Sequence, residues 1–253
     1  MNDKSPSGVM LVTGAGRGIG AGIARMAGSR GYAVGINYGR SQAEAEALAH
    51  DIERAGGRAL ALRADVGEAD QVAAMFETLD AELGPVTALV NNAGILETRV
   101  PLDEMEPEFL ARIFAVNTFS CFYCAGQAIK RMSTAHGGPG GAIVNISSKA
   151  AVLGGLPGWS HYAASNGAVD SFTISLAKEV GPQGIRVNAI RPGVIPTDIQ
   201  KAATDVDFPS AARQTTSLGR MGTVEEVAEA ALWLLSPQAS YVHGIVLDVS
   251  GGR

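Results

Sequence analysis

The feature that most constrains the fold is a repeated alternation of short apolar runs with longer segments of helical spacing. Residues 9–13 are the first apolar run and residues 18–30 the first helical segment, and the alternation continues to a last apolar run at 245–249. Strands separated by helix-length segments are joined by crossovers, which makes a sheet largely parallel and covers both of its faces with helices. The sequence therefore predicts an α/β fold built on a doubly wound, Rossmann-type parallel sheet.

The same periodicity places the remaining elements. Further strands are expected at residues 32–37, 59–63, 86–91, 142–147 and 186–190, and further helices at 41–55, 68–83, 107–132, 160–180 and 224–235. No linker interrupts the pattern, so residues 1–253 are expected to form a single domain. Residues 198–222 are long, polar and weakly periodic. Because long loops in compact domains are usually functional, we expect a substrate loop there.

Composition excludes several classes of protein. A net charge of −5 argues against a nucleic-acid binder, which would show a basic footprint. Cys121 and Cys124 are too few for a disulfide scaffold or a closed metal site, so packing inside a helix is expected for them, with redox chemistry as the alternative. No signal peptide is apparent, and no apolar run approaches the ~18 residues of a membrane span. We expect a cytoplasmic protein that acts on a small molecule, with no metal and no membrane partner.

A glycine-rich loop joins the first strand to the first helix. Glycines let the backbone approach a pyrophosphate, and the N-terminus of the helix supplies free N–H groups and the positive end of its dipole. The order strand, loop, helix is the context that such a loop requires. The sequence therefore predicts a dinucleotide-binding loop, made of Thr13, Gly14, Gly16, Arg17, Gly18, Ile19 and Gly20.

The end of the second strand indicates which dinucleotide is bound. NAD-binding sheets usually carry an acidic residue there for the ribose 2′-hydroxyl, whereas this strand ends in Asn37 and Tyr38 and is followed by Arg40. Arginines such as Arg17 and Arg40 can pair with a 2′-phosphate through charge-assisted hydrogen bonds. NADP is therefore favoured over NAD.

The loop spacing Gly14-x3-Gly18-x-Gly20, the run Asn91-Asn92-Ala93-Gly94, Ser148 and Tyr162 together resemble the short-chain dehydrogenase/reductase family. The resemblance covers almost the whole chain and is strongest to 3-oxoacyl carrier-protein reductases and glucose-dehydrogenase-like enzymes. It implies a homotetramer that transfers hydride between the nicotinamide of NADP(H) and a carbonyl or alcohol. It also implies further cofactor contacts: Asp65 and Val66 at the adenine, Asn91, Ala93 and Gly94 along the cofactor, and Pro192, Gly193, Ile195 and Thr197 around the nicotinamide.

The resemblance also implies catalytic roles. Tyr162 matches the general acid/base and Ser148 the serine that hydrogen-bonds the substrate carbonyl, in preference to its neighbour Ser147. Asn117 matches a helix asparagine that holds a water in a proton relay. In the family, the residue four positions after the tyrosine contacts both the tyrosine and the cofactor.

That fourth position departs from the family pattern. The family has Tyr-x-x-x-Lys, and this chain has Tyr162-Ala-Ala-Ser-Asn166. Residues four apart share a helix face, so Asn166 lies where the ammonium group is expected. A cation lowers the pKa of a neighbouring tyrosine, and a neutral amide lacks that charge. The amide can still hydrogen-bond a ribose hydroxyl, so we expect cofactor binding to survive better than catalysis.

Three interpretations of Asn166 stay open from the sequence. In the first, Asn166 is an introduced substitution that inactivates the enzyme. In the second, it is natural in an active enzyme, which lowers the tyrosine pKa by other means or works at alkaline pH. In the third, the chain is a catalytically impaired NADP-binding regulator or partner subunit. Lys149 follows Ser148 directly, but strand alternation points it to the opposite face. Replacement of the missing cation by Lys149 is therefore not expected.

Overall fold

Seven parallel strands form one sheet in the computed structural model, which describes residues 8–199 and 206–253. The strand order is β3-β2-β1-β4-β5-β6-β7, and every neighbouring pair is parallel. This confirms the predicted doubly wound sheet. The strands are β1 (Val9–Val12), β2 (Ala33–Tyr38), β3 (Arg58–Arg63), β4 (Val86–Asn91), β5 (Gly141–Ile146), β6 (Ile185–Pro192) and β7 (Val246–Val249).

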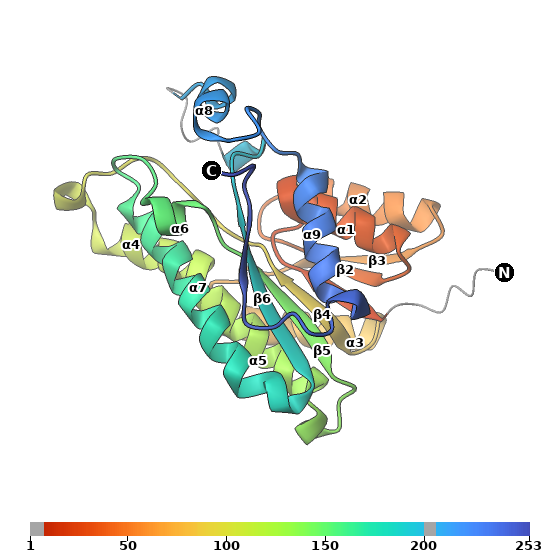
Figure 1. Cartoon of the computed structure of the whole chain (residues 1–253). Helices are drawn as coiled ribbons and strands as arrows, with labels where there is room; N and C mark the ends of the chain where they lie inside the picture. Colours follow the sequence, from red (N-terminus) through yellow and green to blue (C-terminus); the bar gives the residue numbers. More distant parts are fainter. Residues whose placement is uncertain (1–7, 200–205) are drawn as a thin grey trace.

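Helices cover both faces of the sheet (Figure 1). One face carries α1 (Gly18–Ser29), α2 (Gln42–Arg54) and α9 (Val224–Leu235), and the other carries α3 (Ala69–Glu82), α4 (Pro107–Phe114), α5 (Ser120–Met132) and α7 (Ser160–Val180). Each face has its own apolar core, because buried strand side chains alternate between the two layers. Short 3₁₀ turns lie at Leu102–Glu104, Thr134–His136, Gly181–Gln183 and Pro237–Ala239.

The strand order reverses between β1 and β4, which lie side by side in the centre of the sheet. The segments that follow these two strands leave in opposite directions and open a crevice at the carboxyl edge, where doubly wound sheets bind ligands. The glycine-rich loop follows β1 and the Asn91–Gly94 run begins at the end of β4. The topology thus brings the two predicted cofactor motifs to one place.

The long helix expected at residues 107–132 is divided in the structure. A π-helical segment at Ala115–Phe119, labelled η2, separates α4 from α5 and contains Asn117. Pro107–Met132 is long and apolar enough to cross a membrane, with a mean hydropathy of 1.3 over its most apolar window. This differs from our expectation that no segment of the sequence approaches a membrane span. In the fold this segment is a core helix, because α5 packs against β4 and α3.

The cysteines lie in this core helix. Cys121 and Cys124 on α5 are both buried and are not joined by a disulfide. Burial raises the pKa of Cys121 to about 12 and raises that of Cys124 further. Reactive cysteines have lowered pKa values, so the structure favours packing over redox chemistry for this pair.

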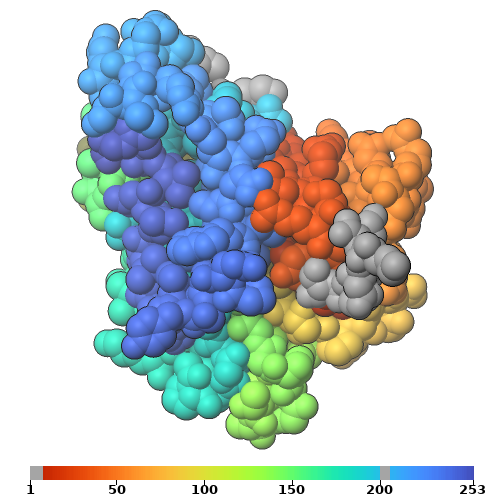
Figure 2. Space-filling model, turned by 45° about the vertical axis from the view of Figure 1, so that its right-hand side comes forward, coloured from red at the N-terminus to blue at the C-terminus, as the bar shows by residue number. Residues whose placement is uncertain are grey.

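The expected substrate loop at residues 198–222 contains a helix that the sequence pattern did not show. In its described part, α8 (Phe208–Thr215) begins where the Asp207 side chain accepts a hydrogen bond from the Ser210 backbone N–H (3.1 Å). Residues 200–205 lie outside the described part. Figure 2 shows α8 at one end of the molecule, beside a notch that separates it from α1 and α2. A second short helix, α6 (Ala150–Leu153), follows β5.

Candidate active site

The phosphate loop is held in place by side chains of the strand ends beside it. Thr13 Oγ1 accepts hydrogen bonds from the backbone N–H groups of Asn92 (2.9 Å) and Ala93 (3.0 Å). Asn92 Nδ2 in turn donates to the carbonyl oxygens of Thr13 (2.9 Å) and Gly14 (3.1 Å). A Cβ atom at Gly20 would lie 2.4 Å from Asn92 Nδ2. The loop is therefore tied to the end of β4, and glycine is required for that approach.

Asn37 ties the same loop to β2 and β3. Its Oδ1 accepts from the backbone N–H of Gly14 (3.1 Å), and its Nδ2 donates to the carbonyl oxygens of Leu62 (3.2 Å) and Ala64 (3.1 Å). The side chain is buried, as is that of Tyr38, which packs into the core under α2. Both residues were predicted to contact the cofactor. In the structure, their side chains are buried in the walls of the crevice, and the cofactor contact stays a prediction.

The residues present fit a bound pyrophosphate at the start of α1. No side chain caps this helix, and its first turn contains no acidic residue, so the positive end of the dipole is not neutralised locally. Gly18 has a φ of 58°, and a Cβ there would lie 3.4 Å from Thr197 Cγ2. The phosphate loop thus lies against the segment that begins at Pro192, the last residue of β6, and continues through Gly193, Ile195 and Thr197.

The two arginines expected at the ribose differ in their surroundings. Arg17 forms an ion pair with Asp198 (3.7 Å between Nη1 and Oδ2). Arg40 is exposed just beyond β2, and its charge is close enough to help lower the pKa of Asp65. Arg40 forms no ion pair with any residue of the described ranges 8–199 and 206–253. It is the more available of the two for a ligand phosphate.

Asp65 is anchored from a helix that sequence reasoning did not connect with the cofactor. Arg112 Nη2 on α4 lies 2.8 Å from Asp65 Oδ2. Although partial burial acts to raise the pKa of Asp65, hydrogen bonds from Arg112 and the Gly67 backbone bring it below its usual range. Val66, the next predicted adenine neighbour, is buried. Arg112 lies far from both predicted motifs in sequence, so no local pattern could have indicated this contact.

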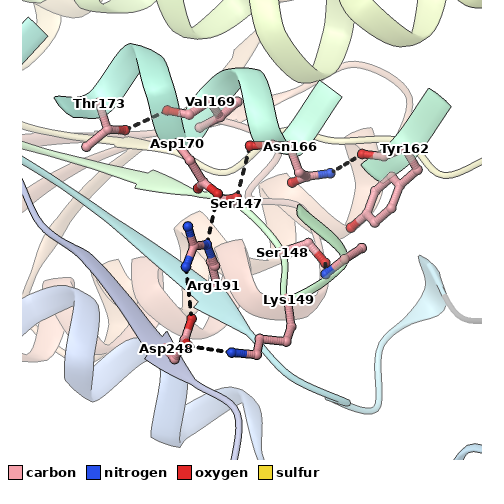
Figure 3. A network of polar contacts seen from close by, with 11 residues as sticks. Ser147, Ser148, Lys149, Tyr162, Asn166, Val169, Asp170, Thr173, Arg191 and Asp248 are labelled. Carbon is pink, nitrogen blue, oxygen red and sulfur yellow. Dashed lines mark hydrogen bonds and ion pairs between the residues drawn. The ribbon is translucent and has the colours of Figure 1, made fainter. Parts of the chain in front are cut away.

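The two serines after β5 are used differently. Ser147 is buried, and its hydroxyl donates to the Asn166 carbonyl oxygen (3.2 Å). Ser148 is partly exposed and is hydrogen-bonded to the Tyr162 side chain. Figure 3 shows the Tyr162 phenol directed toward Ser148. This geometry places Ser148, the serine that we preferred, beside the tyrosine.

Asn166 turns back onto its own helix. Its Nδ2 donates to the Tyr162 carbonyl oxygen, four residues earlier, over 2.9 Å. The side chain is buried. Such a bond is the usual local alternative for a short amide side chain in a helix. An amide in this position presents no positive charge to the phenol above it.

The surroundings of Tyr162 hold its phenol in the neutral form. Burial raises the pKa of Tyr162 above its usual value of 10.0, and hydrogen bonds with Ser148 and Asn166 offset only part of that increase. Both of these neighbours are neutral. The phenol is therefore a weaker acid than a free tyrosine, which is the effect expected when desolvation outweighs the stabilisation of a charge.

Lys149 is directed away from the tyrosine, as predicted. Figure 3 shows it paired with Asp248 of β7, on the other side of Ser148 from Tyr162. Asp248 also lies 3.5 Å from Arg191 Nη1, and Arg191 Nε lies 2.8 Å from Asp170 Oδ2 on α7. Lys149 and Arg191 are thus both paired with carboxylates.

Asn117 connects the π-helical segment with the catalytic helix. Its Oδ1 accepts from the Ile95 backbone N–H (2.8 Å), and its Nδ2 donates to the Ile95 carbonyl (2.9 Å) and to Ser165 Oγ (3.1 Å). A Cβ at Gly94 would lie 3.7 Å from Asn117 Oδ1. Asn91, at the end of β4, donates to Asn145 Oδ1 (2.8 Å). The side-chain amides of Asn91 and Asn117 therefore hold strand β4 and the loop after it.

Comparisons with known proteins agree with this arrangement. A family described as enoyl-(acyl carrier protein) reductase matches residues 14–253. The uncharacterized oxidoreductase YgfF of Escherichia coli K12 is 42% identical over 97% of this chain and 99% of its own length. A short-chain dehydrogenase from Burkholderia cenocepacia, solved with NADP, superposes with a TM-score of 0.89 at 30% identity, covering 99% of both chains. A 3-ketoacyl-(acyl-carrier-protein) reductase from Brucella melitensis, solved with NADH, gives a TM-score of 0.89 at 35% identity over 98% of both chains.

Proposed function

The chain belongs to the short-chain dehydrogenase/reductase family, and we propose that it is an NADP(H)-dependent oxidoreductase that interconverts a carbonyl compound and its alcohol. The observation that carries the proposal is the Tyr162 phenol directed at Ser148, at the carboxyl edge of the sheet where the phosphate loop also lies. When bound, the nicotinamide would supply or accept the hydride. The residues proposed to hold it are those of the phosphate loop, the end of β4 and the segment after β6.

In the proposed reduction, Ser148 donates a hydrogen bond to the substrate carbonyl oxygen and Tyr162 transfers its proton to the same atom. In the oxidation, the Tyr162 phenolate accepts the hydroxyl proton of the alcohol. Well-placed acid/base groups contribute about 10²- to 10⁴-fold to the rate. Asn117 is proposed to take part in the proton relay. Its side chain holds the loop after β4, at Ile95, and the Ser165 hydroxyl.

Asn166 sets the limit on this chemistry. The hydrogen-bonding neighbours of the Tyr162 phenol are neutral, and burial raises the pKa of that phenol, so Tyr162 forms its phenolate only at alkaline pH. Each unit of pKa depression that a cation would provide corresponds to ~1.4 kcal/mol of preferential stabilisation of the phenolate. We propose that the chain binds NADP(H) normally and turns over slowly near neutral pH.

NADP is the proposed cofactor because the end of β2 offers Arg40 and no carboxylate. The solved relatives contain NADP in one case and NADH in another, so the fold accommodates both dinucleotides. An exposed arginine with no ion pair among the described residues supports recognition of a 2′-phosphate.

We further propose that residues 1–253 form one domain that assembles as a homotetramer in the cytoplasm. Phe119 in η2, Phe122 on α5 and Ile174 on α7 are large apolar side chains that remain more than 40% exposed in the isolated chain, at 45%, 49% and 43%. A second copy of the chain would remove them from water.

The test is to measure NADPH binding and NADPH oxidation together, using a panel of ketones and aldehydes, for the chain and its Asn166→Lys variant. Both proteins are expected to bind NADPH with similar affinity, and the lysine variant is expected to turn over faster at neutral pH. The control is Tyr162→Phe combined with Asn166→Lys, and this double variant should lose the faster turnover of Asn166→Lys. Binding without turnover in either protein would favour the alternative of an NADP-binding regulator or partner subunit.

A further inference from the structure

A third apolar cluster lies beside the catalytic tyrosine, apart from the two cores that flank the sheet. Leu96 and Trp159 are its buried members, at 6% and 5% exposure. The partly buried side chains that pack against them come from four separate segments and are Leu156, Tyr162, Ile199, Val206 and Phe208. The Tyr162 ring is thus part of an apolar wall, and the wall belongs to the substrate side of the site.

The wall is fixed by hydrogen bonds between its loops. The Val100 backbone N–H donates to the Gly158 carbonyl (3.0 Å), which joins the loop after β4 to the loop before α7. His161, next to Tyr162, holds the Leu96 carbonyl through its Nε2 (3.1 Å) and packs edge-on against Phe109. This arrangement prepares Trp159 and Leu96 in position before any ligand binds, and preorganised contacts lower the entropic cost of binding.

Trp159 carries a polar atom that no described residue satisfies. Its indole Nε1 is buried and has no hydrogen-bond partner among the described residues. A buried donor without an acceptor costs about 1–3 kcal/mol. An indole N–H can only donate, so the group that would relieve this cost must be a hydrogen-bond acceptor. The Arg99 guanidinium lies over the same ring, 4.9 Å from its centroid, and adds a positive charge to this part of the wall.

From these observations we infer the class of substrate, an inference that rests on the proposed function. The site takes a carbonyl compound with a flat, apolar body, and the Trp159 Nε1–H group donates a hydrogen bond to an acceptor on that body. The carbonyl itself lies at Ser148 and Tyr162. A sugar fits this description less well, because most of its hydroxyl groups would lie against the apolar side chains of Leu96, Leu156 and Phe208, which offer no hydrogen-bond partners.

The test uses the indole signals of the ¹⁵N-labelled chain in its NADP⁺ complex. The chain has only two tryptophans, and Trp233 is 43% exposed on α9, so Trp233→Phe assigns the Trp159 signal. Three probes share one aromatic body: acetophenone has no second acceptor, methyl 4-acetylbenzoate has a neutral one, and 4-acetylbenzoate has an anionic one. The last two distinguish whether the acceptor is neutral or charged.

The Trp159 indole proton should move downfield with the acceptor-bearing ketones and not with acetophenone. Trp159→Phe should weaken binding of those ketones by about 3- to 10-fold, the size of one net hydrogen bond. The dissociation constant for acetophenone should change by no more than about twofold. An indole signal that stays in place while the acceptor-bearing ketones saturate the site would overturn the inference. This measurement on the unmodified chain holds even if Trp159→Phe folds poorly.

The outcomes also separate this inference from the proposed function. If the ketones bind and shift Trp159 but neither the chain nor Asn166→Lys reduces them, the substrate class stands as a ligand class and the proposed function fails. If Asn166→Lys reduces sugars or small aliphatic ketones as well as it reduces flat ones, the oxidoreductase function stands and the inference fails.

Discussion

The cofactor half and the catalytic half of the crevice use their polar side chains differently. Around the phosphate loop, Thr13, Asn37 and Asn92 bond to the backbone, which fixes the loop to three strands. Around the catalytic helix, Trp159 Nε1 and His161 Nδ1 are buried without partners among the described residues. The first half is a framework held by hydrogen bonds to the backbone, in which Asn91 Oδ1 is the buried atom without a partner among the described residues. In the second half, these two polar atoms remain available for hydrogen bonds with a substrate.

We propose that this difference lets residue 166 affect catalysis without affecting cofactor binding. Asn166 belongs to the catalytic half, where its amide bonds to its own helix and leaves Tyr162 without a cation. Nothing in the network of Thr13, Asn37 and Asn92 depends on residue 166. The comparison can be tested by changing one residue of the cofactor half at a time and measuring whether only cofactor parameters respond.

The largest effect in the cofactor half is expected for Arg40→Asp. Replacing the cation by an anion removes a charge-assisted bond to a 2′-phosphate, worth about 1.5–3 kcal/mol, and adds repulsion. The ratio of the dissociation constants for NADPH and NADH should therefore change by about 10- to 100-fold toward NADH. The control is Arg40→Gln, which removes the charge alone and should show a smaller change. An unaltered ratio in both variants would mean that Arg40 does not face the phosphate.

A smaller effect is expected for Arg112→Gln. The Arg112–Asp65 pair is partly exposed, at 43% and 35% of the two side chains, and such pairs contribute about 0.2–1 kcal/mol. We predict a KM for NADPH raised about two- to fivefold with little change in kcat, and partial recovery in Arg112→Lys. A fall in kcat at unchanged KM would show that α4 acts on the catalytic half instead, and would break the comparison.

The fold and the site motifs were predictable from the sequence because their signals are local. Apolar runs with glycine at their ends located β1 and the phosphate loop, and the four-residue spacing of Tyr162 and Asn166 placed both on one helix face. Two features were not predictable. The first is the π segment that contains Asn117, whose side chain bonds to Ile95 and Ser165, far away in sequence. The second is helix α8, which spans only Phe208–Thr215, too short a segment for its apolar spacing to stand out in the sequence.

The site also held contacts that no sequence spacing could give. Arg112 on α4 forms an ion pair with Asp65, which follows β3. Trp159 meets Arg99 where two loops pair through Val100 and Gly158. Asn37 and Tyr38 were predicted as cofactor contacts from their place at the end of β2. In the structure, their side chains are buried in the framework.

The most direct test of the central claim is the pH dependence of alcohol oxidation with NADP⁺, measured for the chain and for Asn166→Lys. In the proposed oxidation the Tyr162 phenolate accepts the proton of the alcohol, so the rate is expected to rise as pH passes through the pKa of that phenol. Because burial raises this pKa and no cation among the described residues lowers it, the rate of the chain should still be rising above pH ~10, the ordinary tyrosine value. In Asn166→Lys the midpoint should fall by about one unit or more. Superimposable profiles would contradict the account, because residue 166 would then not control the tyrosine.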